Sequence, residues 1–143
     1  MSEANKALVR RFYEEAFMKG NLDVIDEISE PNFIDHNPAP GQEPGIQGIK
    51  KSLVEYRTAF PDLQITVEDM IAEGDKVVAR ITATGTHKGV FAGIPATGKR
   101  ASISVIDIVR VANGKAVERW GIEDNMGLMQ QLGVIPSPRQ GGG

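Results

Sequence analysis

The stretch 102-SISVIDIVRVANGKAVERWGI-122 carries the pattern that decides the fold. Ile103, Val105, Val109 and Val111 fall at every second position and so share one face of a strand, with Asp107 among them. The Asn113-Gly114 step that follows favours a tight hairpin turn, because both residue types tolerate positive φ angles. A return strand is predicted over residues 116–122. This stretch therefore predicts a long antiparallel hairpin.

The residues before this hairpin predict two further strands. Residues 63–71 alternate in polarity, and residues 77–86 are rich in β-branched side chains. Residues 73–75 (Glu-Gly-Asp) separate them and read as a turn. Residues 88–100 contain three glycines and a proline, which indicates a loop. The second half of the chain therefore predicts a meander of strands.

The first half of the chain follows a helical period. Apolar side chains from Leu8 to Phe17 fall on one stripe of a helix, with Ser2 at its start and Gly20 at its end. Helices first, strands next and a short helix last indicate an α+β fold. The predicted helices cover residues 2–20, 22–28 (closed by Pro31), 49–60 and 126–132, with an irregular loop over residues 33–45.

The length and composition suit one domain with one core. The chain has 143 residues, of which 41% are hydrophobic, and this is too short for two ordinary domains. No repeat of fixed period is visible. We predict a single domain over residues 1–135 and a flexible C-terminal tail over residues 136–143, which are rich in proline and glycine.

Charge and cysteine content exclude several classes of protein. The formal net charge is -3 and the sequence pI is about 5.4, so a nucleic-acid partner is not expected. The absence of cysteine excludes disulfides and thiolate nucleophiles, and two distant histidines without a ligand cluster predict no metal site. The polar N-terminus lacks a signal-peptide core, and no apolar run approaches the ~18 residues of a membrane span. We expect a soluble, cytoplasmic protein without a membrane partner.

Asp107 is a candidate catalytic residue, because it interrupts the apolar row between Ile103 and Val111. Buried acids are rare unless they are paired or functional. A two-residue turn would pair Asp107 with Trp120 and place Asp124 on the same face, whereas a three-residue loop with a bulge would reverse that relation. The alternatives for Asp107 are a satisfied structural carboxylate or an acid that faces outward.

Asp124 is the first candidate for a general base. A carboxylate in an apolar pocket has a raised pKa, and it can then remove a proton from a carbon beside a carbonyl group. Asp124 also precedes the closing helix, where aspartate is a favoured N-cap, and Gly127 falls in the first turn. Both roles can hold together.

His36 is a third catalytic candidate, since it stands at the mouth of the proline-rich loop and an imidazole there can orient or protonate a substrate oxygen. The alternative is a loop histidine bonded to nearby backbone. His87 ends a predicted strand, and we expect it at the rim or on the surface. Trp120 can line a pocket or pack in the core. The candidate substrate-binding residues are Trp120, Arg80, Phe33 and Tyr56.

One motif has the spacing of a nucleotide-binding loop. Residues 93–99 (GIPATGK) match a P-loop, but Arg100 stands where Ser or Thr is required. The segment also leads into a strand, so no helix N-terminus follows to receive a phosphate. Nucleotide binding is therefore not expected.

Several segments resemble the SnoaL-like polyketide cyclase family of the nuclear-transport-factor-two-like superfamily. The resemblance covers roughly residues 5–134, and the order of the elements agrees with it. The segments are FIDHNP (33–38), AFPD (59–62), GTH (85–87), GIPATGK (93–99), NGK (113–115), WGIED (120–124) and QQLG (130–133).

The resemblance implies a cone-shaped α+β barrel, in which N-terminal helices pack on a strongly curved, mainly antiparallel sheet and enclose a pocket. It also implies a homodimer through the sheet, no metal or organic cofactor, and an acid at the position of Asp124. In the named cyclases an aspartate acts as general acid/base on a polyketide ester and closes a ring by an intramolecular aldol step. The superfamily also holds epoxide hydrolases, isomerases, dehydratases and binding proteins, so the fold alone does not fix the reaction.

An epoxide hydrolase of this superfamily would be expected to carry an Arg and an Asp two residues apart on a central strand. Here Arg80 is followed by Thr82, and Ile122 rather than an acid lies two residues past Trp120. Both features count against epoxide hydrolysis.

We therefore expect a cofactor-free acid/base enzyme that acts on a small or medium-sized apolar carbonyl compound. Asp124 would be the base, assisted by His36 or Asp107. The alternatives are a binding or carrier protein with the same pocket, and a structural dimerisation domain whose pocket is filled. Small residues within 77–85 leave room for a cavity and disfavour the last alternative.

Overall fold

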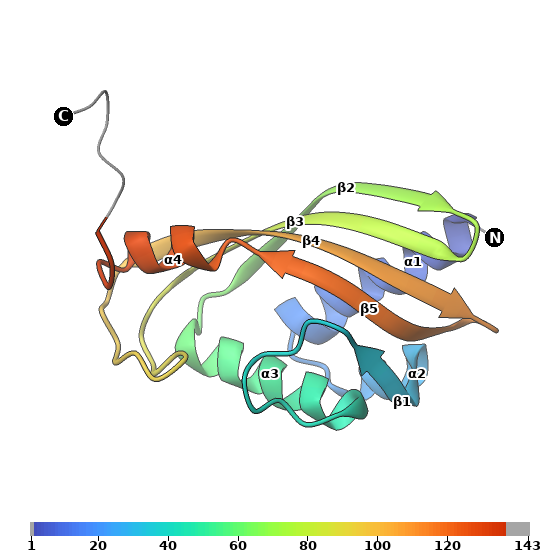
Figure 1. The fold of residues 1–143 in the computed structure, drawn as a ribbon, viewed down its shortest axis with the longest axis horizontal. Helices are drawn as coiled ribbons and strands as arrows, with labels where there is room; N and C mark the ends of the chain where they lie inside the picture. Colours follow the sequence, from blue (N-terminus) through green and yellow to red (C-terminus); the bar gives the residue numbers. More distant parts are fainter. Residues whose placement is uncertain (1, 137–143) are drawn as a thin grey trace.

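The computed structural model describes residues 2–136, which form helices and a five-stranded sheet (Figure 1). Apart from Pro136, the predicted flexible tail lies outside the described residues. In chain order the elements are α1 (Ser2–Arg11), the π-helix η1 (Phe12–Met18), α2 (Asp23–Ile28), β1 (Ser29–Asp35), α3 (Gly45–Ala59), β2 (Gln64–Glu73), β3 (Lys76–Thr86), β4 (Arg100–Ala112), β5 (Lys115–Glu123) and α4 (Asn125–Gln131).

The strands lie in the order β1-β5-β4-β3-β2. β1 runs parallel to β5, and the other neighbours are antiparallel. The predicted α+β class is confirmed, with a mixed sheet that stays open rather than closing into a barrel. The α1 helix packs against β2 and β3, and α3 packs against β1. We call the sheet face that meets these helices the inner face, and the opposite one the outer face.

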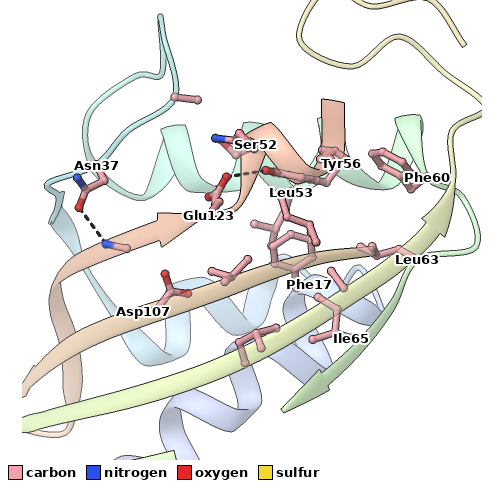
Figure 2. Close-up of a pocket in the computed structure, with 18 of the residues that line it drawn as sticks. Phe17, Asn37, Ser52, Leu53, Tyr56, Phe60, Leu63, Ile65, Asp107 and Glu123 are labelled. Carbon is pink, nitrogen blue, oxygen red and sulfur yellow. Dashed lines mark hydrogen bonds between the residues drawn. The ribbon is translucent and has the colours of Figure 1, made fainter. Parts of the chain in front are cut away.

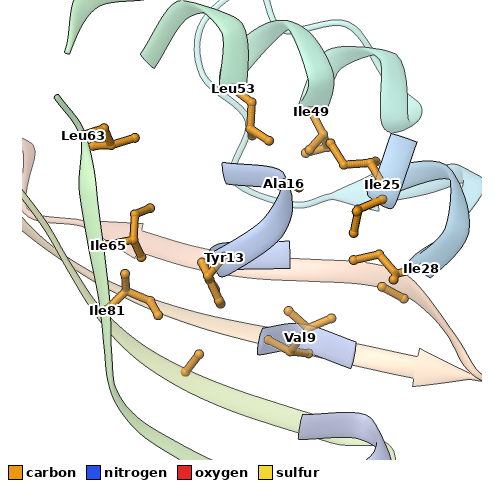
Figure 3. Packing of buried hydrophobic residues seen from close by; sticks show 14 of the residues in the cluster. Val9, Tyr13, Ala16, Ile25, Ile28, Ile49, Leu53, Leu63, Ile65 and Ile81 are labelled. Carbon is orange, nitrogen blue, oxygen red and sulfur yellow. The ribbon is translucent and has the colours of Figure 1, made fainter. Parts of the chain in front are cut away.

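The core fills the space between the helices and the inner face (Figure 3). Val9 and Tyr13 of the first helical segment meet Ile49 of α3 and Ile81 of β3 within one buried cluster. Burying a side chain of this kind contributes about 1.5–3 kcal/mol. The apolar stripe read from the first helix therefore anchors it on the sheet.

The hairpin between β4 and β5 has a two-residue turn, one of the two loop lengths that the sequence left open. Asn113 and Gly114 have φ angles of 53° and 76°, as a type I′ turn requires. A bulge at Val117 follows, because Val111 pairs with Ala116 while Arg110 pairs with Glu118.

This bulge changes the register that the turn alone predicts. Asp107 lies opposite Gly121, and Trp120 lies opposite Ile108 on the outer face. Of the two face relations that the sequence left open, the structure therefore has the reversed one, because one extra residue in a strand reverses the face of every later side chain.

The segment after α2 also differs from the sequence prediction. Residues 33–35 belong to strand β1 and not to an irregular loop. Pro31 does not end this strand, because β1 lies at the edge of the sheet, where a missing backbone donor is tolerated. The first helix differs as well, since residues 12–18 form a π-helix.

The predicted alternation of β2 holds only as far as its bulge between Val67 and Asp69. Beyond it, Ile71 pairs with Val78 and is 64% exposed. The second half of β2 therefore places Asp69 and Ile71 on the outer face.

Candidate active site

A cavity of about 520 Å³ lies between the inner face of the sheet and the helices η1 and α3 (Figure 2). Small-molecule sites generally measure roughly 300–1,000 Å³. Leu53, Ile65 and Ile81 are among the aliphatic side chains that line it. We call it the aromatic cavity, because five of its lining residues contact one another in edge or tilted arrangements: Phe12, Phe17, Tyr56, Phe60 and Phe91.

Four charged side chains meet at one end of this cavity, and we call them the Arg119 cluster. Arg119 Nη1 donates to Asp35 Oδ1 at 2.8 Å, and its Nε donates to Asp107 Oδ1 at 2.9 Å. Its Nη2 lies 3.5 Å from Glu123 Oε1. Burial disfavours the charge on Arg119, but Asp107 and Asp35 outweigh this effect and raise its pKa. The cluster thus holds three carboxylates around one permanent cation.

Three strands bring the Arg119 cluster together. Asp35 ends β1 and pairs with Arg119 in the parallel β1–β5 ladder, while Asp107 lies on the neighbouring β4. Alternate residues of a strand share a face, so Arg119, Gly121 and Glu123 of β5 all point inward. The exposed fraction of the side chain is 14% for Arg119, 9% for Asp35 and 6% for Asp107.

Two tyrosine hydroxyls donate to this cluster. Tyr13 of η1 donates a hydrogen bond to Asp107 Oδ2, and Tyr56 of α3 donates to Glu123 Oε2 at 3.2 Å. Burial, followed by the charge of the partner carboxylate, raises the pKa of both phenols well above the ordinary value. Both tyrosines therefore keep their protons at neutral pH and can donate hydrogen bonds.

The loop after β1 holds one side of the cluster. Asn37 accepts a hydrogen bond from the Gly121 backbone N–H at 2.9 Å, and its own N–H donates to Asp35 Oδ1 at 3.0 Å. Gln42 Nε2 donates to Asp35 Oδ2 at 3.1 Å. These hydrogen bonds from the loop fix the orientation of the Asp35 carboxylate. Asp35, Asn37 and Gln42 also line the cavity.

Two of the sequence-based candidates lie in the aromatic cavity. Asp107 is 4% exposed and faces inward, and Tyr56 lines the cavity wall. Phe33, a substrate-binding candidate, is 7% exposed within the main core and is not among the residues that line the aromatic cavity.

Asp124 lies outside the cavity, at the start of α4. Its Oδ1 accepts a hydrogen bond from the Gly127 N–H at 2.9 Å, and the residue is exposed. Of the two roles that the sequence left open, this geometry is that of the helix N-cap. Its neighbour Glu123 points into the cavity instead, because adjacent residues of a strand face opposite sides.

His36, Trp120 and Arg80 lie away from the aromatic cavity. The rings of His36 and Trp120 stack at 4.6 Å, and His36 Nε2 lies 2.7 Å from Glu118 Oε2. Arg80 Nη2 pairs with Asp69 Oδ2 at 2.9 Å on the outer face. The bulge at Val117 explains the position of Trp120, and the end of β1 carries His36 to the same side.

His87 is buried rather than at the rim, so the sequence-based expectation is wrong. It is 0% exposed, stacks on Phe60, and its Nδ1 lies 3.0 Å from Thr97 Oγ1. Its backbone N–H donates to the Lys99 carbonyl at 2.9 Å. The loop between β3 and β4 folds back over His87, an arrangement that depends on loop contacts that no periodic pattern reveals.

Sequence reasoning did not identify Arg119, Asp35, Glu123 or Tyr13. The bulge alone brings Arg119 to the inner face, and no local pattern signals it. Asp35 stood in a predicted loop. Tyr13 was read as part of an apolar stripe, although a hydroxyl on a buried helix face could have suggested a polar partner on the sheet.

Within residues 2–136, no three His, Asp or Glu side chains form a group suited to a metal ion. The helices of that same part of the chain are too short or too polar to cross a membrane.

The family model for SnoaL-like polyketide cyclases matches residues 7–132. An aklanonic acid methyl ester cyclase of Streptomyces sp. strain C5 is 30% identical over 133 residues, which cover 88% of this chain and 80% of the relative. A nogalonic acid methyl ester cyclase of Streptomyces nogalater is 31% identical over 123 residues, covering 82% and 90%.

Solved structures are also similar. TsrD of Streptomyces laurentii superposes with a TM-score of 0.87 at 32% identity, over 94% of this chain and 98% of that one. A SnoaL-like polyketide cyclase of Agrobacterium tumefaciens C58 gives a TM-score of 0.75 over 90% and 97% of the two chains. At 19% identity, this second likeness supports the fold alone.

Proposed function

Since the chain belongs to the SnoaL-like polyketide cyclase family, we propose that it is an acid/base enzyme of cyclase type that acts on an uncharged polyketide carbonyl compound. The observation that carries this proposal is the Arg119 cluster at one end of the aromatic cavity. It combines carboxylates, which can accept a proton, with tyrosine hydroxyls, which can donate one. A cavity of this size supports an enzyme or a binding protein over a purely structural domain.

The proposed reaction is an intramolecular aldol addition. A carboxylate removes a proton from a carbon beside a carbonyl group, and the electron pair of that C–H bond forms a new C–C bond to a second carbonyl carbon. The second carbonyl oxygen becomes an alkoxide and takes up a proton. No atom is lost, so product and substrate are isomers, and neither an oxidant nor an organic cofactor is needed.

The lining of the cavity favours an uncharged, aromatic substrate. The ionisable groups of its polar end, apart from the two phenols, are Arg119 and the carboxylates of Asp35, Asp107 and Glu123. All three carboxylates already lie within 3.5 Å of the one guanidinium. The net negative charge of these groups would repel a free carboxylate on the substrate, whereas it would not repel an uncharged ester. Aromatic side chains provide stacking surfaces for planar rings.

The direct test is an assay with the methyl esters of aklanonic acid and nogalonic acid, the compounds that the names of the relatives carry. We expect a product of unchanged mass and altered chromatographic retention. In D₂O, the enzyme should also exchange deuterium into the acidic carbon position. Tight retention of an unchanged ester would contradict the proposal and indicate a carrier protein, and binding of neither ester would contradict its substrate class.

We also propose that two copies of the chain associate through the outer face of the sheet. Ile71, Ile106 and Ile122 are 64%, 50% and 71% exposed there. A contiguous exposed apolar surface of this kind often marks a protein interface. Two adjacent cross-strand rows contribute to it: Ile71, Val78, Ile108 and Trp120 in one, and Ile106 and Ile122 in the next, where the ion pair of Arg80 and Asp69 borders the apolar side chains.

A further inference from the structure

We propose that Glu123, and neither Asp107 nor Asp124, is the catalytic base of the reaction; this assignment rests on the proposed function. Glu123 is the last residue of β5 and its side chain lines the aromatic cavity. In Figure 2 it reaches towards Tyr56 of α3, whereas Asp107 lies on the sheet below. The hydrogen bonds of the three carboxylates separate their roles.

Asp107 and Asp35 have their oxygens occupied by strong donors. Asp107 Oδ1 lies 2.9 Å from both Nε and Nη2 of Arg119, while its Oδ2 accepts from Tyr13. Asp35 accepts from Arg119, from the Asn37 backbone and from Gln42. A carboxylate oxygen whose lone pairs already accept from protein donors offers little room to a proton of a bound substrate. These two acids therefore hold Arg119 in place rather than accept a substrate proton.

Glu123 is held more loosely. Its Oε2 accepts one hydrogen bond, from Tyr56 at 3.2 Å, and its Oε1 lies 3.5 Å from Arg119 Nη2. No hydrogen bond to Oε1 comes from residues 2–136. The side chain is 28% exposed, compared with 9% for Asp35 and 6% for Asp107. Glu123 Oε1 thus has a lone pair free to face a bound substrate.

The contacts of Glu123 suit a complete proton cycle. The carbon proton moves to Oε1, and the electron pair of the C–H bond forms the new C–C bond. The same proton then passes from Glu123 to the alkoxide oxygen, which restores the carboxylate. Tyr56 keeps its proton throughout and holds the second oxygen, so the carboxylate stays oriented between the two transfers.

Adjacent residues provide a matched test. Glu123→Gln keeps the shape of the side chain and an oxygen that accepts from Tyr56, but it removes the base. Asp124→Asn makes the same chemical change one residue away, outside the cavity, and asparagine still caps α4. Both variants should fold like the wild type by circular dichroism.

With aklanonic acid methyl ester, we expect kcat of Glu123→Gln to fall by a factor on the order of 10²–10⁴, with KM little changed. Deuterium exchange at the acidic carbon should fall equally, while Asp124→Asn keeps wild-type values. In Glu123→Ala, added formate should restore part of the turnover in proportion to its concentration, because the vacated site opens to the cavity.

Three results would overturn the assignment. Turnover by Glu123→Gln near the wild-type rate would show that another group removes the proton. An equal loss in Asp124→Asn would show that the effect is not specific to the cavity-facing acid, and an absence of formate rescue would contradict a role as base. If the wild-type protein neither turns over nor exchanges the esters, the proposed function itself fails, and that result is distinct from these three.

Discussion

Gly121 lies directly opposite Asp107 in the β4–β5 ladder, and a Cβ atom at position 121 would lie 2.2 Å from Asp107 Oδ1. The same atom would lie 2.2 Å from Arg119 Nη2. The buried ion pair therefore occupies the space that a side chain at position 121 would fill. The glycine is needed here for close approach and not for an unusual backbone angle.

Gly121→Ala should lower the free energy of unfolding by about 1–3 kcal/mol, the usual cost of overpacking a buried site. Chemical denaturation measures this change. In the double variant with Asp107→Ala the clash is partly relieved. The loss of unfolding free energy in the double variant should therefore be smaller than the sum of the losses in the two single variants. Full additivity would show that the ion pair does not set the requirement for glycine.

Arg119→Ala should be the more damaging substitution, because it leaves buried carboxylates without their cation. Loss of one partner of a buried pair typically costs about 3–5 kcal/mol. Arg119→Lys retains the charge but replaces the three spread nitrogens of the planar guanidinium with a single ammonium nitrogen, which cannot reach all three carboxylates, so we expect an intermediate loss. Denaturant unfolding of both variants checks the order, and a Lys variant less stable than the Ala variant would contradict it.

The hairpin and the apolar row that contains Asp107 follow from local sequence, whereas the sequence leaves the direction of the Asp107 side chain open. Alternation places the carboxylate among apolar neighbours, and the Asn113-Gly114 step fixes a two-residue turn. The bulge at Val117 has no comparable signal, yet it decides that Arg119 faces inward and Trp120 outward. A single inserted residue therefore changes which side chains of β5 meet those of the neighbouring strands on each face.

The remaining members of the cluster depend on contacts between distant parts of the chain. Asp35 and Arg119 are 84 residues apart in sequence, and their parallel pairing reflects the burial of β1 against α3. Glu123 and Asp124 look equivalent in sequence. Only the end of β5 and the start of α4 show that one points into the cavity and the other caps a helix.

The cap at Asp124 can be tested apart from catalysis. Asp124→Ala removes the acceptor for the Gly127 N–H and should cost about 1 kcal/mol of stability. Asp124→Asn should cost little, because asparagine caps equally well. Thermal and denaturant unfolding of the two variants measure the difference. Equal stability of both variants would mean that the side chain contributes little to α4.

We predict a dimer that forms through the outer face of the sheet and depends on two paired isoleucines. Ile106 and Ile122 lie opposite each other on adjacent strands and are half or more exposed. A glutamate at either position would introduce like charges into a symmetric interface. We expect a dimer for the wild type and a monomer for Ile106→Glu by sedimentation velocity, with Val54→Glu on the exposed side of α3 as a control that adds the same charge away from the sheet. A monomeric wild type would contradict the proposed interface.

The two tyrosines of the chain provide a test of the buried polar end by pH. Burial first, and then the facing carboxylates, raise the pKa of Tyr13 and Tyr56 in the folded state, whereas the unfolded chain titrates at about 10. A raised folded pKa gives a stabilising contribution that is complete below the unfolded pKa and is lost as pH rises towards the folded one.

The phenolate absorbance should therefore stay flat through pH values around 10, the ordinary pKa of tyrosine, and rise only when circular dichroism shows unfolding. Tyr56→Phe leaves Tyr13 as the single phenol, and its absorbance should rise in the same step as unfolding. A phenolate signal that appears near the ordinary pKa while the protein stays folded would mean that these hydroxyls are open to solvent. That result would remove the basis for treating Tyr56 as a permanent hydrogen-bond donor to Glu123.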